Sequence, residues 1–98
     1  MATQHRRYRL KPGVVDEFVE LWAQQVVPLR RQFGFEVAGA WASTADDVFV
    51  WLVSHPGDFA AAEKQYYESP ERAAISPDPA EFIEQAEVVM VEAVDAPS

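Results

Sequence analysis

The sequence predicts one α+β domain over residues 1–98, with elements in the order strand, helix, strand, strand, helix, strand. Ninety-eight residues suffice for one hydrophobic core and are too few for two. Apolar residues recur every three or four positions between residues 18 and 33, which is the period of an amphipathic helix. Segments rich in valine, phenylalanine and tryptophan alternate with turn residues elsewhere, as strands do.

Residues 3–10 form the first predicted strand, which Lys11-Pro12-Gly13 ends. Alternation places residues 5, 7 and 9 on one face of this strand and residues 4, 6, 8 and 10 on the other. Half of the eight positive charges of the chain lie within residues 6–11: Arg6, Arg7, Arg9 and Lys11. At least one of these arginines should therefore face inward.

A long helix is predicted over residues 14–33. Its apolar stripe consists of Phe18, Trp22, Val26, Leu29 and Phe33. Arg30 and Arg31 suit the negative C-terminal end of this helix. Pro28 removes one backbone hydrogen bond, so we expect a kink near residues 24–28. Gly34 suits the left-handed position that follows a helix.

Residues 35–43 and 47–54 are predicted to pair as a hairpin around a polar turn. Asp58 is expected to cap a second helix over residues 58–68, which Ser69-Pro70 ends.

The remaining segments are shorter. The proline-rich stretch 70–84 predicts one or two short helical turns. Residues 87–94 are expected to form a last apolar strand, and residues 95–98 a frayed tail.

This order has a simple compact solution, the ferredoxin-like antiparallel sheet with both helices on one face. The first and third strands would be central, and the second and fourth would be edges. The third strand is apolar on both faces, because Phe49, Trp51 and Val53 alternate with Val48, Val50 and Leu52. Two helices cover one face only, and the cheapest cover for the other is a second copy. The expected partner is therefore the chain itself, as a homodimer.

Composition excludes several classes of function. The net charge is −8, and residues 50–98 carry ten acidic but only two basic side chains, so nucleic acid is an unsuitable partner. The absence of cysteine excludes disulfides, iron–sulfur clusters, thiolate zinc sites and cysteine nucleophiles. Two histidines fifty residues apart do not predict a metal site, so no cofactor is expected, although haem ligation by one histidine stays open.

The chain also contains no apolar run of the ~20 residues that a membrane helix needs. Its first residues do not resemble a signal peptide. We therefore expect a cytoplasmic protein without a membrane partner.

Several ordered segments resemble the NIPSNAP domain. They are Arg6-Arg7-Tyr8-Arg9-Leu10-Lys11-Pro12-Gly13, Phe18-x-x-x-Trp22, Val27-Pro28-Leu29, Gly39-Ala40-Trp41, Phe49-Val50-Trp51-Leu52 and Tyr66-Tyr67-x-Ser69-Pro70. The resemblance implies a dimeric α+β barrel, in which two sheets lie face to face and enclose a lumen in each subunit. That superfamily hosts oxygenases, cyclases, isomerases, dehalogenases and binding proteins on one scaffold, so it implies a small-molecule site and no single reaction.

Three positions depart from the family pattern. Gln4 stands where relatives often carry an acidic residue, Val53 where an arginine is common, and Arg72 where an aromatic residue often follows the Ser-Pro step.

Arg6 and Tyr8 are the first candidates for a functional site, facing the lumen with Trp41, Trp51 and His55. An arginine beside aromatic rings can hold a flat acidic or enolisable molecule and stabilise developing negative charge. Tyr8 or His55 would move the proton. The alternative is that the tryptophans are core and that Arg6 pairs with a carboxylate across the dimer.

Two further ligand contacts are predicted at Phe49 and Tyr66. Tyr66 and Tyr67 end the second helix, and one of them should face the sheet while the other lies at the surface.

The leading hypothesis is a small-molecule-binding protein, in its catalytic form a cofactor-independent enzyme of oxygenase, cyclase or isomerase type acting on an aromatic or polyketide-like substrate. The alternative is a non-catalytic dimeric binding or scaffolding module. A lumen of ~300 Å³ or more favours the first, and a filled lumen favours the second.

Overall fold

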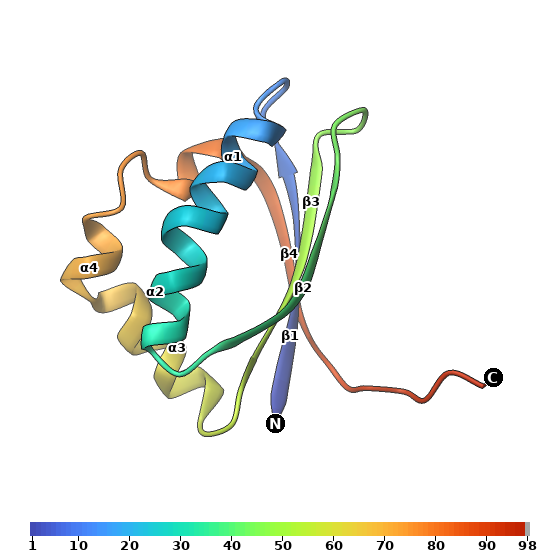
Figure 1. Ribbon diagram of the computed structural model, residues 1–98, viewed down its shortest axis with the longest axis vertical. Coiled ribbons are helices and arrows are strands. Elements are labelled where there is room, and N and C mark those ends of the chain that lie inside the picture. Colours follow the sequence, from blue (N-terminus) through green and yellow to red (C-terminus); the bar gives the residue numbers. More distant parts are fainter. Residues whose placement is uncertain (98) are drawn as a thin grey trace.

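The computed structural model describes residues 1–97 and has the predicted order of elements (Figure 1). A four-stranded antiparallel sheet has the order β2-β3-β1-β4, and the helices lie against one of its faces. The elements are β1 (Ala2–Leu10), α1 (Val15–Leu21), the π-helical turn η1 (Trp22–Val26), α2 (Val27–Gln32), β2 (Glu36–Ser43), β3 (Val48–His55), α3 (Phe59–Glu68), α4 (Pro70–Ala73), the 3-10 turn η2 (Pro79–Phe82) and β4 (Ile83–Val91). The predicted central and edge strands are confirmed.

The central strand β1 fixes which side chains reach the helices. Arg6 lies between Trp51 of β3 and Val88 of β4, and Tyr8 lies between Phe49 and Ala86. Because residues opposite one another in a sheet share a face, Arg6, Tyr8 and their partners on β3 all point toward the helices. The predicted alternation along β1 is confirmed.

The long helix is continuous from α1 through η1 to α2 (Figure 1). The irregular part of this helix is the π-helical turn η1, which ends at Val26, two residues before Pro28. Pro28 has no N–H to donate to the carbonyl four residues earlier, and a wider turn accommodates that missing bond. The disturbance expected near residues 24–28 is thus a π turn. Gly34 follows with φ +87°, as predicted.

The second helical region also agrees with expectation. The Asp58 side chain accepts a hydrogen bond from the Ala61 N–H and caps α3. Ser69 ends α3 and caps α4 in the same way, through the Arg72 N–H. The short turns expected in the proline-rich stretch are α4 and η2.

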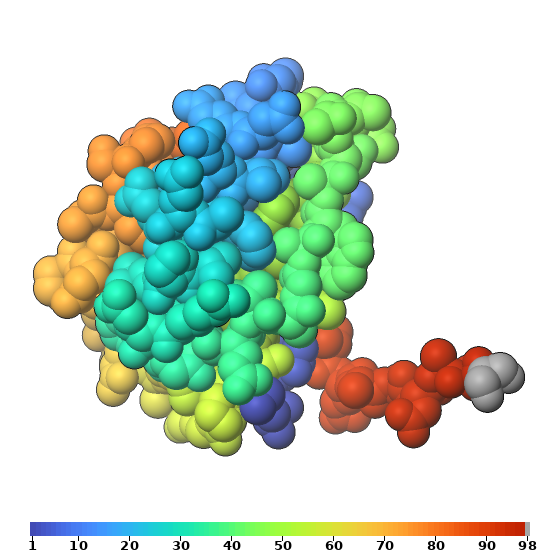
Figure 2. Space-filling model, in the orientation of Figure 1, coloured from blue at the N-terminus to red at the C-terminus, as the bar shows by residue number. Residues whose placement is uncertain are grey.

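The apolar pattern predicts a last strand that begins and ends further along the chain than the observed one. β4 begins at Ile83 and ends at Val91, whereas residues 87–94 were expected. Glu84 and Gln85 are exposed on this edge strand, where polar side chains are free to face solvent. The segment that follows β4 extends away from the body (Figure 2), and Ser98 lies outside the described residues.

The two faces of the sheet differ in their cover. Tyr8, Phe49 and Trp51 on the helix side are buried in the core. On the other side, Trp41 is 60% exposed and Val89 is 54% exposed. One chain therefore covers one face, as the count of helices predicts. No helix among residues 1–97 has the length and apolarity needed to cross a membrane.

Candidate functional site

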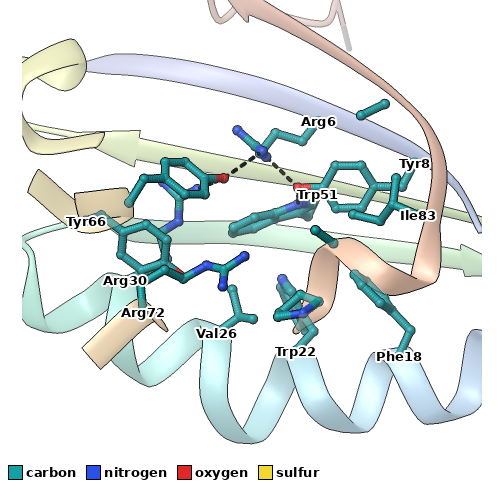
Figure 3. A pocket seen from close by; sticks show the side chains of 14 residues that line it. Arg6, Tyr8, Phe18, Trp22, Val26, Arg30, Trp51, Tyr66, Arg72 and Ile83 are labelled. Carbon is teal, nitrogen blue, oxygen red and sulfur yellow. Dashed lines mark hydrogen bonds between the residues drawn. The ribbon is translucent and has the colours of Figure 1, made fainter. Parts of the chain in front are cut away.

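A pocket of about 140 Å³ lies between the sheet and the helices (Figure 3). Arg6, Tyr8 and Trp51 reach it from the sheet, and the long helix faces them across the cavity. The helices and loops contribute Phe18, Trp22, Val26, Arg30, Tyr66, Tyr67, Arg72, Pro79 and Ala80, and β4 contributes Ile83 and Ala86. The site was expected in a lumen between two sheets. That placement is wrong, because the inward-facing residues of β1 and β3 point toward the helices of their own chain.

Arg6 is buried and uses all three of its nitrogens. Its Nε donates to the Tyr8 hydroxyl oxygen at 2.6 Å, and its Nη2 donates to the Tyr67 hydroxyl oxygen at 3.0 Å. Its Nη1 donates to Gln4 Oε1 at 2.7 Å and to Glu63 Oε1 at 3.0 Å. The carboxylate partner of Arg6 thus lies on α3 of the same chain, so a partner across a dimer is not what holds this guanidinium.

Burial acts to lower the pKa of Arg6. The oxygens of Tyr8 and Tyr67 and the Glu63 carboxylate outweigh it and raise the pKa above the ordinary value. Arg6 is consequently a permanent cation in this site.

Arg30 of α2 is a pocket residue that the sequence interpretation assigned only to the end of the helix. It is 1% exposed, and its Cζ lies 4.2 Å from the ring centre of Tyr66 and 4.8 Å from that of Phe35. Its Nη2 donates to the Tyr67 hydroxyl oxygen at 3.0 Å and lies 3.6 Å from Glu63 Oε1. A signal for this placement exists in the sequence. Phe18, Trp22, Val26 and Arg30 are each four residues apart, so Arg30 continues the stripe that faces the sheet.

The pocket carries more positive than negative charge. Arg6 and Arg30 share the single carboxylate of Glu63. Arg72 has its own partner, Asp78, at 3.2 Å. A buried cation is costly unless it is paired, so the unshared charge of the Arg6–Arg30 pair favours an anion in the cavity.

Tyr8 is placed to donate a proton. Its oxygen accepts hydrogen bonds from Arg6 Nε and, at 3.1 Å, from Trp51 Nε1. Among residues 1–97 no acceptor is found for its own O–H, and the side chain lines the pocket. Two N–H donors on this oxygen would stabilise the negative charge left by proton transfer.

The tyrosine pair behaves as predicted. Tyr66 is buried against the sheet, while Tyr67 is 45% exposed at the rim of the pocket. Burial raises the pKa of Tyr66 above its ordinary value, so its hydroxyl stays protonated. The Tyr67 oxygen joins the two arginines by accepting a hydrogen bond from each.

Three residues predicted for the site lie elsewhere. His55 is the last residue of β3, where its Nε2 lies 3.1 Å from the Phe33 carbonyl oxygen and its Nδ1 accepts from the Gly57 N–H at 2.9 Å. A carbonyl oxygen can only accept and an amide N–H can only donate, so these two contacts fit the tautomer that carries hydrogen on Nε2. Both nitrogens are occupied, and His55 does not line the pocket.

Trp41 and Phe49 are also outside the pocket. Ala40 is the residue of β2 that pairs with Trp51 and shares its face of the sheet. Trp41 is the next residue, so it points to the opposite, open face, where it pairs with Val50. Phe49 is core, with its ring centre 5.1 Å from those of Phe18 and Trp22. The expectation that one cavity gathers Arg6 with these residues is therefore wrong for Trp41, Phe49 and His55, while Tyr8, Trp51 and Tyr66 do line it with Arg6.

The departures from the family pattern have structural roles. Gln4 supplies the oxygen that accepts from Arg6. Val53 is fully buried in the core, and Arg72 reaches the pocket with its Cζ 5.6 Å from the ring centre of Tyr67.

The NIPSNAP family model matches residues 3–95 of the chain. This protein belongs to the NIPSNAP family. Its fold is similar to that of an uncharacterised NIPSNAP domain protein from Burkholderia xenovorans, at 24% identity and a TM-score of 0.79, with full coverage of both chains. A NIPSNAP family protein from Agrobacterium tumefaciens is similar at 16% identity and a TM-score of 0.83, covering 96% of this chain and 93% of the other.

An antibiotic biosynthesis monooxygenase is also similar in fold, at 20% identity and a TM-score of 0.70 over 97% of this chain and 100% of that one. No curated protein matches. The arrangement of sheet and helices is the predicted ferredoxin-like one, and the NIPSNAP resemblance seen in the sequence is confirmed.

Proposed function

We propose that this NIPSNAP protein binds a small, flat acid in the pocket between its sheet and its helices. The observation that carries the proposal is the shared carboxylate: Arg6 and Arg30 are both buried and have one Glu63 between them. An acidic ligand would complete the pairing of charges, and the Trp51 indole beside both guanidinium groups offers it an aromatic surface.

The size of the cavity narrows the ligand. Its volume of about 140 Å³ is well below the ~300 Å³ typical of sites for larger organic molecules. A buried cavity of roughly 150 Å³ can hold a benzene-sized molecule. The supported substrate class is therefore a single-ring acid, and the polyketide-like alternative is disfavoured.

Thermal stability in the presence of benzoate tests the binding proposal. Ligand that binds only the folded state raises Tm, so the wild-type chain should be stabilised progressively by millimolar benzoate. Arg30→Met replaces the guanidinium group with an unbranched apolar side chain and so removes the cation. This variant should show no rise in Tm with benzoate. Arg31→Met, at the exposed neighbouring position on the same helix, should retain it. An Arg30→Met variant that keeps the full shift, or a wild-type chain that shows none, would contradict the proposal.

We propose further that the bound acid is a substrate for cofactor-independent proton transfer of the isomerase type. Tyr8 would transfer its O–H proton to the enolate carbon of the ligand, which gives the ketone and a negatively charged Tyr8 oxygen that the N–H groups of Arg6 and Trp51 stabilise. In the reverse direction the Tyr8 oxygen would take the proton back from that carbon, so the two directions together exchange the proton. The oxygenase alternative rests on fold likeness to the monooxygenase alone, which is weaker support than placed residues.

Deuterium incorporation into phenylpyruvate in D₂O, followed by NMR, separates this reaction from simple binding. The wild-type chain should accelerate exchange at the carbon next to the ketone, and Tyr8→Phe should lose at least tenfold of that acceleration while still binding benzoate. If wild type and Tyr8→Phe exchange at the uncatalysed rate and both bind benzoate, the non-catalytic binding module is the correct function.

We also propose a homodimer in which a second copy covers the open face of the sheet. The supporting observation is the apolar side chains on that face, where Trp41, opposite Val50, and Val89 are largely exposed. Sedimentation at micromolar concentration should give twice the 11.0 kDa chain mass. Trp41→Glu should shift it toward the monomer, and Val94→Glu, in the exposed tail, should not. A wild-type monomer would contradict this proposal.

A further inference from the structure

Three buried side-chain nitrogens have no hydrogen-bond partner among residues 1–97. They are Nε1 of Trp22 and Nε and Nη1 of Arg30. Both residues line the pocket, so the three nitrogens belong to side chains of its wall. All three are also donors. Buried donors without acceptors destabilise a fold, and native structures contain few of them, which indicates that the occupant of this cavity supplies acceptor atoms.

The two residues stand at opposite ends of one surface. Trp22 and Arg30 are eight residues apart on the same helix stripe, a separation of roughly 12 Å along a helix axis. Val26 lies between them on that stripe and lines the pocket. The indole of Trp51 faces both: its ring centre is 5.6 Å from that of Trp22 and 5.5 Å from Arg30 Cζ (Figure 3).

The surroundings of the two ends differ in charge. Arg30 is a cation that shares its carboxylate, so its free N–H groups favour an anionic oxygen. The Trp22 N–H is neutral and adjoins Phe49 and Trp51, whose rings are apolar. A water molecule at that point would find few of the two to four partners that a buried water needs. An oxygen carried on the ligand itself satisfies the indole N–H better.

We propose that the ligand is an aryl carboxylate with a second oxygen acceptor on the far side of its ring. The carboxylate accepts from Arg30, the ring lies between Val26 and Trp51, and a carbonyl or hydroxyl oxygen accepts from Trp22 Nε1. The inference rests on the proposed function, because it requires an acid in this pocket, and it adds the second recognition point.

Two acids of nearly equal shape test the second point by titration calorimetry. In 4-acetylbenzoate the para group carries a carbonyl oxygen, and in 4-isopropylbenzoate a methyl group replaces that oxygen. The wild-type chain should bind 4-acetylbenzoate about fivefold to tenfold more tightly, which is the usual effect of one neutral hydrogen bond. Trp22→Phe keeps a ring at this position and removes the N–H, so it should bind both acids equally.

Benzoate itself separates the two levels of the proposal. If wild type binds benzoate but shows no preference between the two para-substituted acids, the second recognition point is absent and the acid site stands. A preference that persists unchanged in Trp22→Phe also overturns the inference, because another group then provides the donor. If wild type binds none of the three acids, the proposed function fails together with the inference.

Discussion

The two faces of the sheet carry similar side chains in different environments. Arg6 and Arg7 are neighbours on β1, yet Arg6 is buried among four hydrogen-bond partners, while Arg7 is exposed and lies 4.0 Å from Glu87. The two tryptophans Trp51 and Trp41 differ in the same way. Position on the sheet, and not residue type, decides which arginine can serve a ligand and which tryptophan is core.

The two faces also differ in whether their side chains find partners within the chain. On the helix side, side chains of β1, α2 and α3 satisfy one another around Glu63 and Tyr67. On the open side, no segment of residues 1–97 covers the exposed apolar residues of β2 and β4. The polar side chains on the helix side are therefore largely paired within the chain, whereas the open side presents exposed apolar residues, which is the contrast on which the two proposals rest.

The largest expected difference between the faces concerns the tryptophans. Trp51→Ala should lower the free energy of unfolding by about 3–5 kcal/mol, because it empties a buried site and removes the N–H that reaches Tyr8. Trp41→Ala should cost about 1 kcal/mol or less, and its cost should grow with protein concentration if a second copy covers it. Urea denaturation at two protein concentrations measures both. Equal losses would show that the two faces are equally buried in solution.

The neighbouring arginines should differ next. Arg6→Ala should cost about 2–3 kcal/mol, since Gln4 loses its donor and the oxygens of Tyr8 and Tyr67 each lose one of two donors. Glu63 keeps its ion pair with Arg30. Arg7→Ala should change stability by less than about 0.5 kcal/mol, as is usual for an exposed ion pair. The same denaturation experiment compares them, and a larger loss for Arg7→Ala would reverse the assignment of faces.

A smaller effect is expected from single hydroxyl groups. Tyr67→Phe removes the oxygen that accepts from both Arg6 and Arg30, and should cost about 1–2 kcal/mol. Ser43→Ala, near the exposed hairpin turn, removes the contact with Asp46 and should cost less than about 0.5 kcal/mol. Thermal unfolding of the two variants in parallel checks the order.

The smallest expected effect is a pH dependence of folding stability that arises from Asp78, at the edge of the helix layer. The Ala80 N–H, with Arg72 beside it, lowers the pKa of Asp78 below its ordinary value near 3.8. A carboxylate with a lowered folded-state pKa stabilises the fold above its ordinary pKa, and that contribution is lost as the pH falls through the folded value. Asp78→Asn should therefore be less stable than wild type by about 0.5 kcal/mol near pH 6, since Asp78 is half exposed.

The difference in Tm between wild type and Asp78→Asn should disappear at pH values below the folded pKa. Thermal unfolding between pH 2 and pH 6 measures it. A difference that stays constant across this range would show that the carboxylate charge contributes nothing.

Local patterns predicted much of the fold because the forces behind them act between near neighbours in the chain. The period of two along β1 assigned Arg6 and Tyr8 to one face, and the Asp58 cap and Gly34 marked helix boundaries. The late start predicted for β4 shows the limit of such patterns. Ile83 and Gln85 belong to the strand because they pair with Leu10 and Arg9 of β1, and the polarity of Gln85 gives no sign of it.

The sequence by itself determined the order of elements, the family and the presence of an inward-facing arginine beside Tyr8, since each follows from spacing along the chain. Only the tertiary structure decided where that arginine points and what meets it. Arg30 becomes a pocket residue because the long helix packs its stripe over Trp51, and His55 is withdrawn because the end of β3 packs against Phe33 and Phe35. Such meetings depend on distances between segments far apart in the chain, which no local period encodes.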